Sequence, residues 1–183
     1  NGENKVNILL GNGWYKGRLG FEGGHVNLYG DKFALLAEIH LSYKDGTKEI
    51  IATDTSWKVW KSKVIESEIY DGEVYDDTFL DSVEYGVSEI NLGYERLTAR
   101  LSLPVVIKEK RKPLQLIKTP AGETVIDMGQ NMVGRVRFTV SGPAGTTITL
   151  KHAEVLDKDG NIYFGNLRTA KQIVQYITKG EGV

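Results

Sequence analysis

The sequence predicts an all-β protein built from two antiparallel β-sandwich or jelly-roll modules. Three observations support this fold class: period-two alternation of apolar residues, frequent glycine-rich turns, and the lack of a repeating strand–helix–strand pattern. Glycine occupies 21 of the 183 positions, well above its usual share of about 7%, and so implies many turns. Short strands joined by such turns are typical of sandwiches and jelly rolls.

The clearest strand in the first half of the chain is predicted at residues 37–43, where apolar and polar side chains alternate. Asp45 and Gly46 follow, and an Asp-Gly pair supplies the positive φ angles that a tight hairpin requires. Residues 48–53 continue with strand-forming residues. We therefore expect a β-hairpin here.

The second half of the chain repeats this pattern. Strands are predicted at residues 114–117, 124–128, 134–140, 147–156 and 172–178. Turns around Gly122 and Gly160 separate some of them, and residues 166–171 also allow a helical turn. The expected result is antiparallel sheet.

The segment from about residue 79 to residue 114 lacks sustained alternation and contains a charge run that ends in proline. We place the division between the modules near Pro104 within it. The first module then covers residues 1–103, with a linker from about residue 79, and the second covers residues 104–183.

Composition excludes several function classes. With 23 basic and 24 acidic residues the net charge is -1, so no field attracts nucleic acid or an anionic membrane. The absence of cysteine removes disulfides and thiolate metal sites. No apolar run reaches the roughly 18 residues of a membrane span, and the polar first residues do not form a signal peptide. We expect a soluble piece of a longer bacterial polypeptide, either cytoplasmic or secreted.

The densest acidic cluster lies between Tyr70 and Asp77. Its carboxylates allow three interpretations: a glycosidase pair, a calcium site, for which Asp71, Glu73 and Asp76 are the candidates, or a solvated turn. A glycosidase pair also requires a cleft and one carboxyl with a raised pKa. A turn is the favoured interpretation, and no metal-binding spacing of histidine is found in the sequence.

Aromatic residues in a glycine-rich segment point to carbohydrate, because sugar rings stack their C–H faces on indole and phenol while a few polar groups fix their hydroxyls. A buried tryptophan that anchors the sandwich is the alternative for Trp14. The candidate sugar-binding residues are Asn12, Trp14, Tyr15, His25, Asp71 and Glu73.

Several segments resemble a known family in order and spacing. The amino-terminal domain of bacterial α-L-rhamnosidases is matched by Leu9-Leu10-Gly11-Asn12-Gly13-Trp14-Tyr15-Lys16-Gly17, Thr53-Asp54-Thr55-Ser56-Trp57-Lys58 and Ile69-Tyr70-Asp71-Gly72-Glu73-Val74-Tyr75-Asp76. The next module of that family is matched by residues 119–134, 152–157 and 166–170. The string Asp127-Met128-Gly129-Gln130-Asn131 is the most specific part of this resemblance.

The resemblance implies two β modules ahead of an (α/α) barrel that carries the catalytic acids. The parent polypeptide is then an inverting glycoside hydrolase that releases L-rhamnose, and this segment is a non-catalytic accessory, carbohydrate-binding or scaffold region. Its partners would be L-rhamnose-containing glycans and the carboxy-terminal barrel. In some relatives the first domain binds rhamnose with calcium, which supports Asn12, Trp14, Asp71 or Glu73 as ligand residues.

Two alternatives stay open: a purely structural interdomain module without a ligand, and an independent glycosidase that uses the Asp71–Asp77 cluster. The sequence also departs from the family. Where the family commonly has Ala-Arg, this chain has Asp77-Thr78, which removes a guanidinium that would pair with a carboxylate or a sugar. We also expect both sandwiches to be truncated, with exposed strand edges.

Overall fold

The computed structural model describes residues 2–95 and 97–180 and confirms an all-β fold with antiparallel sheets. Helix is limited to single turns in the described residues: α1 (Gly13–Lys16) and the 3₁₀ turn η1 (Gly165–Leu167). The second of these overlaps the start of residues 166–171, where a helical turn was the alternative. None of the helices in these ranges is long and apolar enough to cross a membrane.

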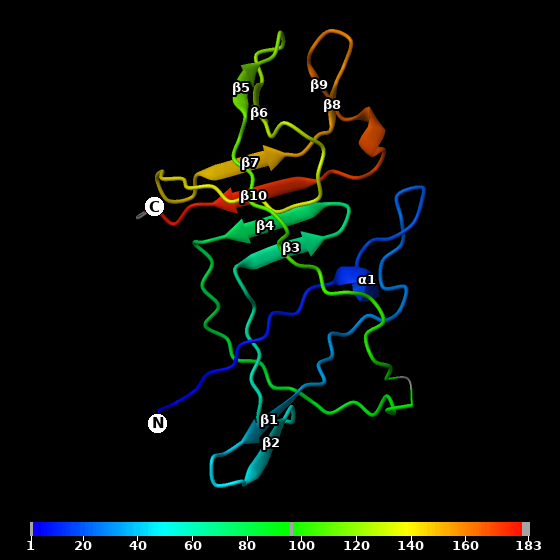
Figure 1. The fold of residues 1–183 in the computed structure, drawn as a ribbon, viewed down its shortest axis with the longest axis vertical. Helices are drawn as coiled ribbons and strands as arrows, with labels where there is room; N and C mark the ends of the chain where they lie inside the picture. Colours follow the sequence, from blue (N-terminus) through cyan, green and yellow to red (C-terminus); the bar gives the residue numbers. More distant parts are fainter. Residues whose placement is uncertain (1, 96, 181–183) are drawn as a thin grey trace.

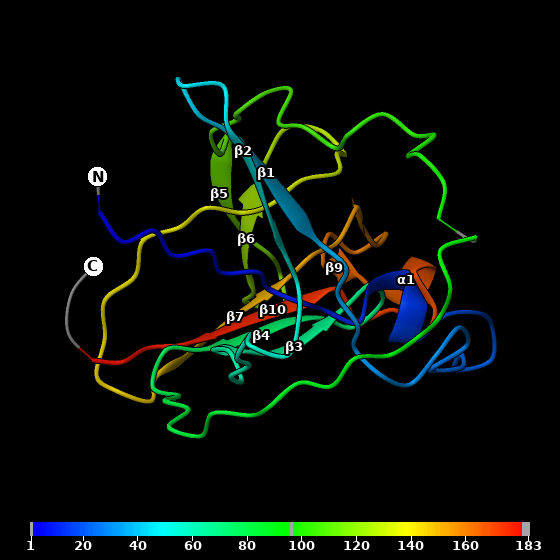
Figure 2. The ribbon, with the colours of Figure 1, turned by 90° about the horizontal axis from the view of Figure 1, so that it is seen from below.

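The centre of the molecule is a four-stranded sheet with the order β3-β4-β10-β7. Its strands are β3 (Val64–Glu68), β4 (Gly72–Asp76), β7 (Thr147–Lys151) and β10 (Ile173–Ile177). The β3–β4 and β10–β7 pairs are antiparallel, whereas β10 runs parallel to β4. Figures 1 and 2 show these strands side by side, although β4 and β10 lie far apart in the sequence.

Three hairpins surround this sheet. They are formed by β1 (Glu38–Ser42) with β2 (Lys48–Ala52), β5 (Gln115–Lys118) with β6 (Thr124–Asp127), and β8 (Val155–Leu156) with β9 (Ile162–Tyr163). In Figure 1 the β1–β2 hairpin lies at one end of the molecule, and the other two lie at the opposite end.

The β1–β2 hairpin confirms its prediction from the Asp-Gly turn. Gly46 has a φ of +86°, which is in the left-handed region that favours glycine. The Asp45 carboxylate accepts hydrogen bonds from the backbone N–H of Thr47 at 2.9 Å and from its hydroxyl at 2.7 Å. These bonds hold the pKa of Asp45 below its ordinary value. The turn therefore fixes the register of Ser42 opposite Lys48.

Two predicted strands are wrong in the described structure. The stretch predicted at residues 147–156 is divided into β7 and β8, which lie in different sheets. Residues 134–140, whose apolar and polar residues alternate in the sequence, pair with no strand. Alternation reports which side chains share a face and does not supply a hydrogen-bonding neighbour. The described residues between β4 and β5 likewise form no strand, as their lack of alternation predicted, and Tyr85 among them makes an isolated bridge with Val59.

The apolar core is shallow. The chain exposes 15506 Å² of surface, whereas a compact monomer of its mass exposes about 8,800 Å². Leu19 is the buried hydrophobic residue among the described ones, and β10 is half-buried along its whole length. The division near Pro104 stays a prediction, but strands from both sides of it share the central sheet.

Gly72 offers a test of the contact between β4 and β10. It has a φ of +96°, and a Cβ there would overlap the carbonyl oxygen of Ile173. We expect Gly72→Ala to lower the free energy of unfolding by more than about 2 kcal/mol, because both the strain and the clash must be relieved.

Two matched variants separate these causes in urea unfolding. Gly46→Ala has positive φ but free space and should cost about 1 kcal/mol. Gly86→Ala has free space and no positive φ and should cost little. A Gly72→Ala variant no less stable than Gly46→Ala would contradict close contact between the strands.

Candidate functional site

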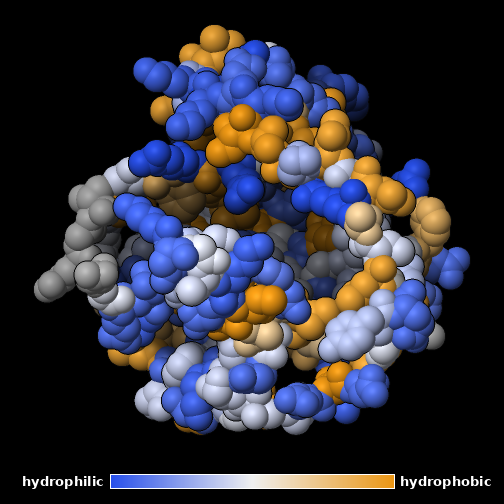
Figure 3. Space-filling view, turned by 60° about the horizontal axis from the view of Figure 1, so that its bottom comes forward, coloured by the Kyte–Doolittle hydropathy of each residue, from blue (hydrophilic) through white to orange (hydrophobic). Residues whose placement is uncertain are grey.

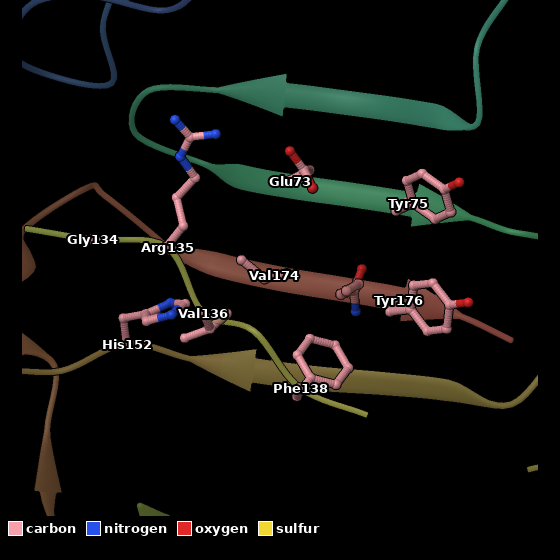
Figure 4. A pocket seen from close by; sticks show the side chains of 10 residues that line it. Glu73, Tyr75, Gly134, Arg135, Val136, Phe138, His152, Val174 and Tyr176 are labelled. Carbon is pink, nitrogen blue, oxygen red and sulfur yellow. The ribbon is translucent and has the colours of Figure 1, made fainter. Parts of the chain in front are cut away.

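A hollow of about 430 Å³ opens on one face of the central sheet. Strands β4 and β10 supply Glu73, Tyr75, Val174 and Tyr176, His152 follows β7, and the segment 134–138 adds Arg135, Val136 and Phe138. Figure 4 shows this segment crossing in front of the sheet. We call this region the aromatic hollow.

The hollow contains three aromatic rings from three different parts of the chain. The rings of Tyr75 and Tyr176 are nearly parallel, with centroids 5.6 Å apart. Phe138 meets Tyr176 edge-on, with centroids 6.1 Å apart and planes at 87°. Tyr75 and Tyr176 are direct neighbours in the parallel register of β4 and β10. The strand pairing therefore creates the aromatic wall.

Polar groups stand at the rim of the hollow. The carboxylate of Glu73 and the guanidinium of Arg135 lie on the β4 side in Figure 4. His152 Nδ1 lies 2.9 Å from the Gln172 carbonyl, which can only accept, so in the neutral ring Nδ1 carries the proton and Nε2 is an acceptor. The hollow thus combines apolar rings with a carboxylate, a cation and an imidazole.

Tyr176 is held in place through its hydroxyl. The hydroxyl donates to Asp77 Oδ2 at 2.9 Å, and Lys63 Nζ contacts Asp77 Oδ1 at 2.6 Å. Lys63 and Tyr176 together hold the pKa of Asp77 below its ordinary value, while the bond to Asp77 raises the pKa of Tyr176. Asp77 stands where the family commonly has alanine. Its carboxylate is bound by Lys63 and Tyr176.

A second polar cluster surrounds Arg18, next to the turn between β3 and β4. Arg18 Nε and Nη2 donate to the two carboxylate oxygens of Asp71, each at 2.9 Å. Lys171 Nζ lies 3.4 Å from Asp71, and the Arg18 guanidinium carbon lies 5.3 Å from the centroid of the Tyr70 ring. Arg18 is the main cause of the lowered pKa of Asp71. We call Arg18, Asp71 and Lys171 the Arg18 cluster.

The predicted sugar-binding residues do not form one site. Asn12 and Asp71 lie near each other because Glu68 accepts hydrogen bonds from the Asn12 side chain and, at 3.2 Å, from the Arg18 backbone N–H. Trp14 and Tyr15 lie on α1, where Trp14 is 70% exposed.

His25 forms an isolated bridge with Leu19, the residue after Arg18. Glu73 is the candidate that lines the aromatic hollow. The exposure of Trp14 disagrees with the alternative in which it anchors the sandwich core.

The three carboxylates considered for calcium stay apart as well. Asp71 is engaged by Arg18 and Lys171, and Asp76 accepts from the backbone and hydroxyl of Thr78. Glu73 and Asp76 point to opposite faces of β4 because they are three positions apart in a strand. Within residues 2–95 and 97–180, no group of three potential ligands is close enough to hold a metal. The calcium site stays a prediction without a preformed cluster.

Sequence analysis missed most of the aromatic hollow. The sequence pattern indicated Phe138, because Phe138 shares one face of its segment with Val136. Nothing in the sequence beyond its strand pattern indicated Tyr176, since its neighbour Tyr75 lies in a distant part of the chain. His152 was not singled out, and only the tertiary structure brings it to the rim.

Known proteins match nearly the whole chain. The model of the α-L-rhamnosidase N-terminal domain matches residues 1–109, and that of the bacterial α-L-rhamnosidase concanavalin-like domain matches residues 117–183. An α-L-rhamnosidase of Streptomyces avermitilis is 36% identical, covering 99% of this chain and 18% of the relative. One of an Alteromonas species is 28% identical, with 99% and 21% covered.

Two solved structures are similar to this fold. The native α-L-rhamnosidase from Aspergillus terreus has a TM-score of 0.86 and 38% identity, over 93% of this chain and 21% of that one. The Streptomyces avermitilis enzyme complexed with L-rhamnose has a TM-score of 0.82 and 37% identity, over 93% of this chain and 18% of that one. The chain spans about a fifth of the length of these relatives.

The Arg18 cluster predicts how stability depends on pH. Because the folded pKa of Asp71 is lowered, its stabilising contribution is present above the unfolded value of about 3.9 and is lost as pH falls through the folded pKa. We expect Asp71→Asn to be less stable than the unsubstituted chain near neutral pH, and the difference to shrink toward about pH 3.

Urea midpoints across this pH range measure the effect. Asp31→Asn is the control, because Asp31 is exposed and its carboxylate makes no ion pair among the described residues. A constant difference between Asp71→Asn and the unsubstituted chain at every pH would show that the charge of Asp71 is not what stabilises the cluster.

Proposed function

Because the chain belongs to the α-L-rhamnosidase N-terminal domain family, we propose that it is a non-catalytic accessory region of an α-L-rhamnosidase and binds rhamnose-containing glycan in the aromatic hollow. The observation that carries this proposal is the combination of three aromatic rings with polar groups at one rim. We assign hydrolysis to a part of the polypeptide outside these residues, because the relatives are much longer than this chain.

The chemistry of the aromatic hollow suits a sugar ring. Aromatic side chains contact the apolar C–H groups of a pyranose, and a few polar groups orient its hydroxyls. Glu73 can accept from hydroxyls, Arg135 can donate to them, and His152 Nε2 can accept. The hollow is also of the size usual for small-ligand sites.

L-Rhamnose is a 6-deoxy sugar and therefore carries a methyl group where most hexoses carry a hydroxymethyl group. Val136 and Val174 line the same hollow as the aromatic rings and offer an apolar contact for that methyl group. A hydroxyl at this carbon would lose hydrogen bonds to water without gaining a partner from the valines. These residues favour a deoxy sugar over its hydroxylated analogue.

The carboxyl groups argue for binding rather than catalysis. Hydrolysis of a glycoside usually requires two carboxyls, one of them with a raised pKa. Glu73 is the carboxylate among the residues that line the hollow. Asp71 and Asp77, at the two ends of the acidic cluster that the independent-glycosidase alternative uses, have lowered pKa values and are held by cations. Neither of these two carboxyls has the raised pKa of the usual general acid.

A structural role is the second candidate, favoured by the exposed apolar surface. Hydrophobic residues gather in patches between hydrophilic ones on the face shown in Figure 3, around a hollowed centre. The exposed surface of 15506 Å² far exceeds that of a compact monomer of this mass. We propose that part of it packs against further domains of the polypeptide, including the (α/α) barrel that the resemblance implies.

Titration calorimetry with L-rhamnose, with and without calcium, separates these candidates. We expect heat of binding with the chain, and about tenfold weaker binding for Phe138→Ala, because the edge of the aromatic wall is lost. Phe21→Ala is the control, since Phe21 is 81% exposed and outside the hollow. L-Mannose, the 6-hydroxy analogue, should also bind about tenfold more weakly.

Absence of heat in both conditions would leave the structural role as the function of the chain. Equal binding by Phe138→Ala would move the sugar site away from the hollow. Release of the aryl group from an aryl rhamnoside by the chain, lost in Glu73→Gln, would overturn the non-catalytic proposal.

A further inference from the structure

The two regions that match separate family models share one sheet. Strands β3 and β4 come from the region of residues 1–109, and β7 and β10 come from that of residues 117–183. Strand β10 lies between β4 and β7, so each of its edges pairs with a different region. The boundary between β4 and β10 is therefore a seam inside a continuous ladder, not a surface between two separate sheets.

Backbone hydrogen bonds extend this seam beyond the paired strands. The register runs from Ile173 opposite Gly72 to Ile177 opposite Asp76. Before it, the Lys171 N–H donates to the Tyr70 carbonyl at 2.8 Å, and after it the Asp77 N–H donates to the Ile177 carbonyl at 2.9 Å. Separation of the regions would break all of these bonds together.

The Arg18 cluster fastens one end of the seam. Arg18 Nη2 donates both to Asp71 in the first region and, at 3.0 Å, to the Thr169 carbonyl in the second. Lys171, also in the second region, lies 3.4 Å from the same Asp71 carboxylate. The side chains of Arg18 and Asp71 are only 16% and 12% exposed, which limits screening by solvent. One guanidinium thus joins three segments.

The other end of the seam is fastened by side chains too. The Tyr176 hydroxyl of the second region donates to Asp77 of the first, and the Tyr75 and Tyr176 rings stack across the seam. The covalent connection contributes little by comparison. Leu101, Leu103 and Val105 within it are each at least 89% exposed, so these side chains hardly pack on the rest of the chain.

We propose that the two family regions are a single folding unit, held together by the β4–β10 ladder and the Arg18 cluster rather than by the connecting segment. Arg18, which contacts both regions, keeps the second region in register with the first. The regions then unfold together and stay associated after the connection is cut. This inference does not depend on sugar binding in the aromatic hollow.

The test cuts the folded chain of 183 residues. A protease recognition sequence is inserted between Val105 and Val106, in the exposed connection, and the purified protein is cleaved under native conditions. We expect both halves to elute together in gel filtration and to give one unfolding transition in urea. Elution as two separate species, or two transitions in the uncut chain, would overturn the proposal.

Substitutions in the cut protein test whether Arg18 holds the two halves together. Arg18→Ala should lower the melting temperature by several degrees and release part of the halves at concentrations where the parent stays associated. Arg18→Lys should restore only part of the association, because lysine cannot bond both carboxylate oxygens and the Thr169 carbonyl in one plane.

Arg100→Ala is the matched control, since Arg100 donates to Leu103 three positions away and, among the described residues, to no other region. It should leave association unchanged. Equal association of the Arg18→Ala and Arg100→Ala halves would show that Arg18 does not hold the two regions together. Loss of association in both would place the contact in the connecting segment instead.

Discussion

The parallel hydrogen bonding between β4 and β10 is the interaction on which the rest of the structure depends. It joins segments just over a hundred positions apart and places β7 on the far side of β10. Parallel strands need a long crossover, and closing a long loop costs conformational entropy that the new contacts must offset. The aromatic hollow exists because this pairing sets Tyr75 beside Tyr176, and the Arg18 cluster exists because it brings Lys171 to Asp71.

Polar contacts rather than a deep core define the register of this sheet. Leu19 is the buried hydrophobic residue among those described, while ion pairs and hydrogen bonds occur at both ends of the seam. Ion pairs of this kind add little net stability, but a wrong register would leave Asp71 or Asp77 half-buried without its cation. A slip by one residue would also turn the side chains of β10 to the other face. The polar contacts therefore select one arrangement.

Local features of the fold were predictable from the sequence, and distant ones were not. Asp45 and Gly46 predicted the β1–β2 hairpin, because the residues of a turn determine its conformation. The all-β class followed in the same way. No local pattern announced that β10 would join β4, that residues 134–140 would cross the sheet unpaired, or that Arg18 would engage Asp71. Asp71 was therefore considered a ligand residue, although its carboxylate is bound by side chains of this chain.

Residue-resolved amide hydrogen exchange on the intact chain tests the central role of the seam most directly. If β4 and β10 form one ladder, their amides open together with the same free energy, and they exchange more slowly than the amides of the peripheral β1–β2 hairpin. The account predicts that Arg18→Ala lowers the protection of both strands equally. Protected β4 amides beside β10 amides that exchange at the rate of the connecting segment would contradict it.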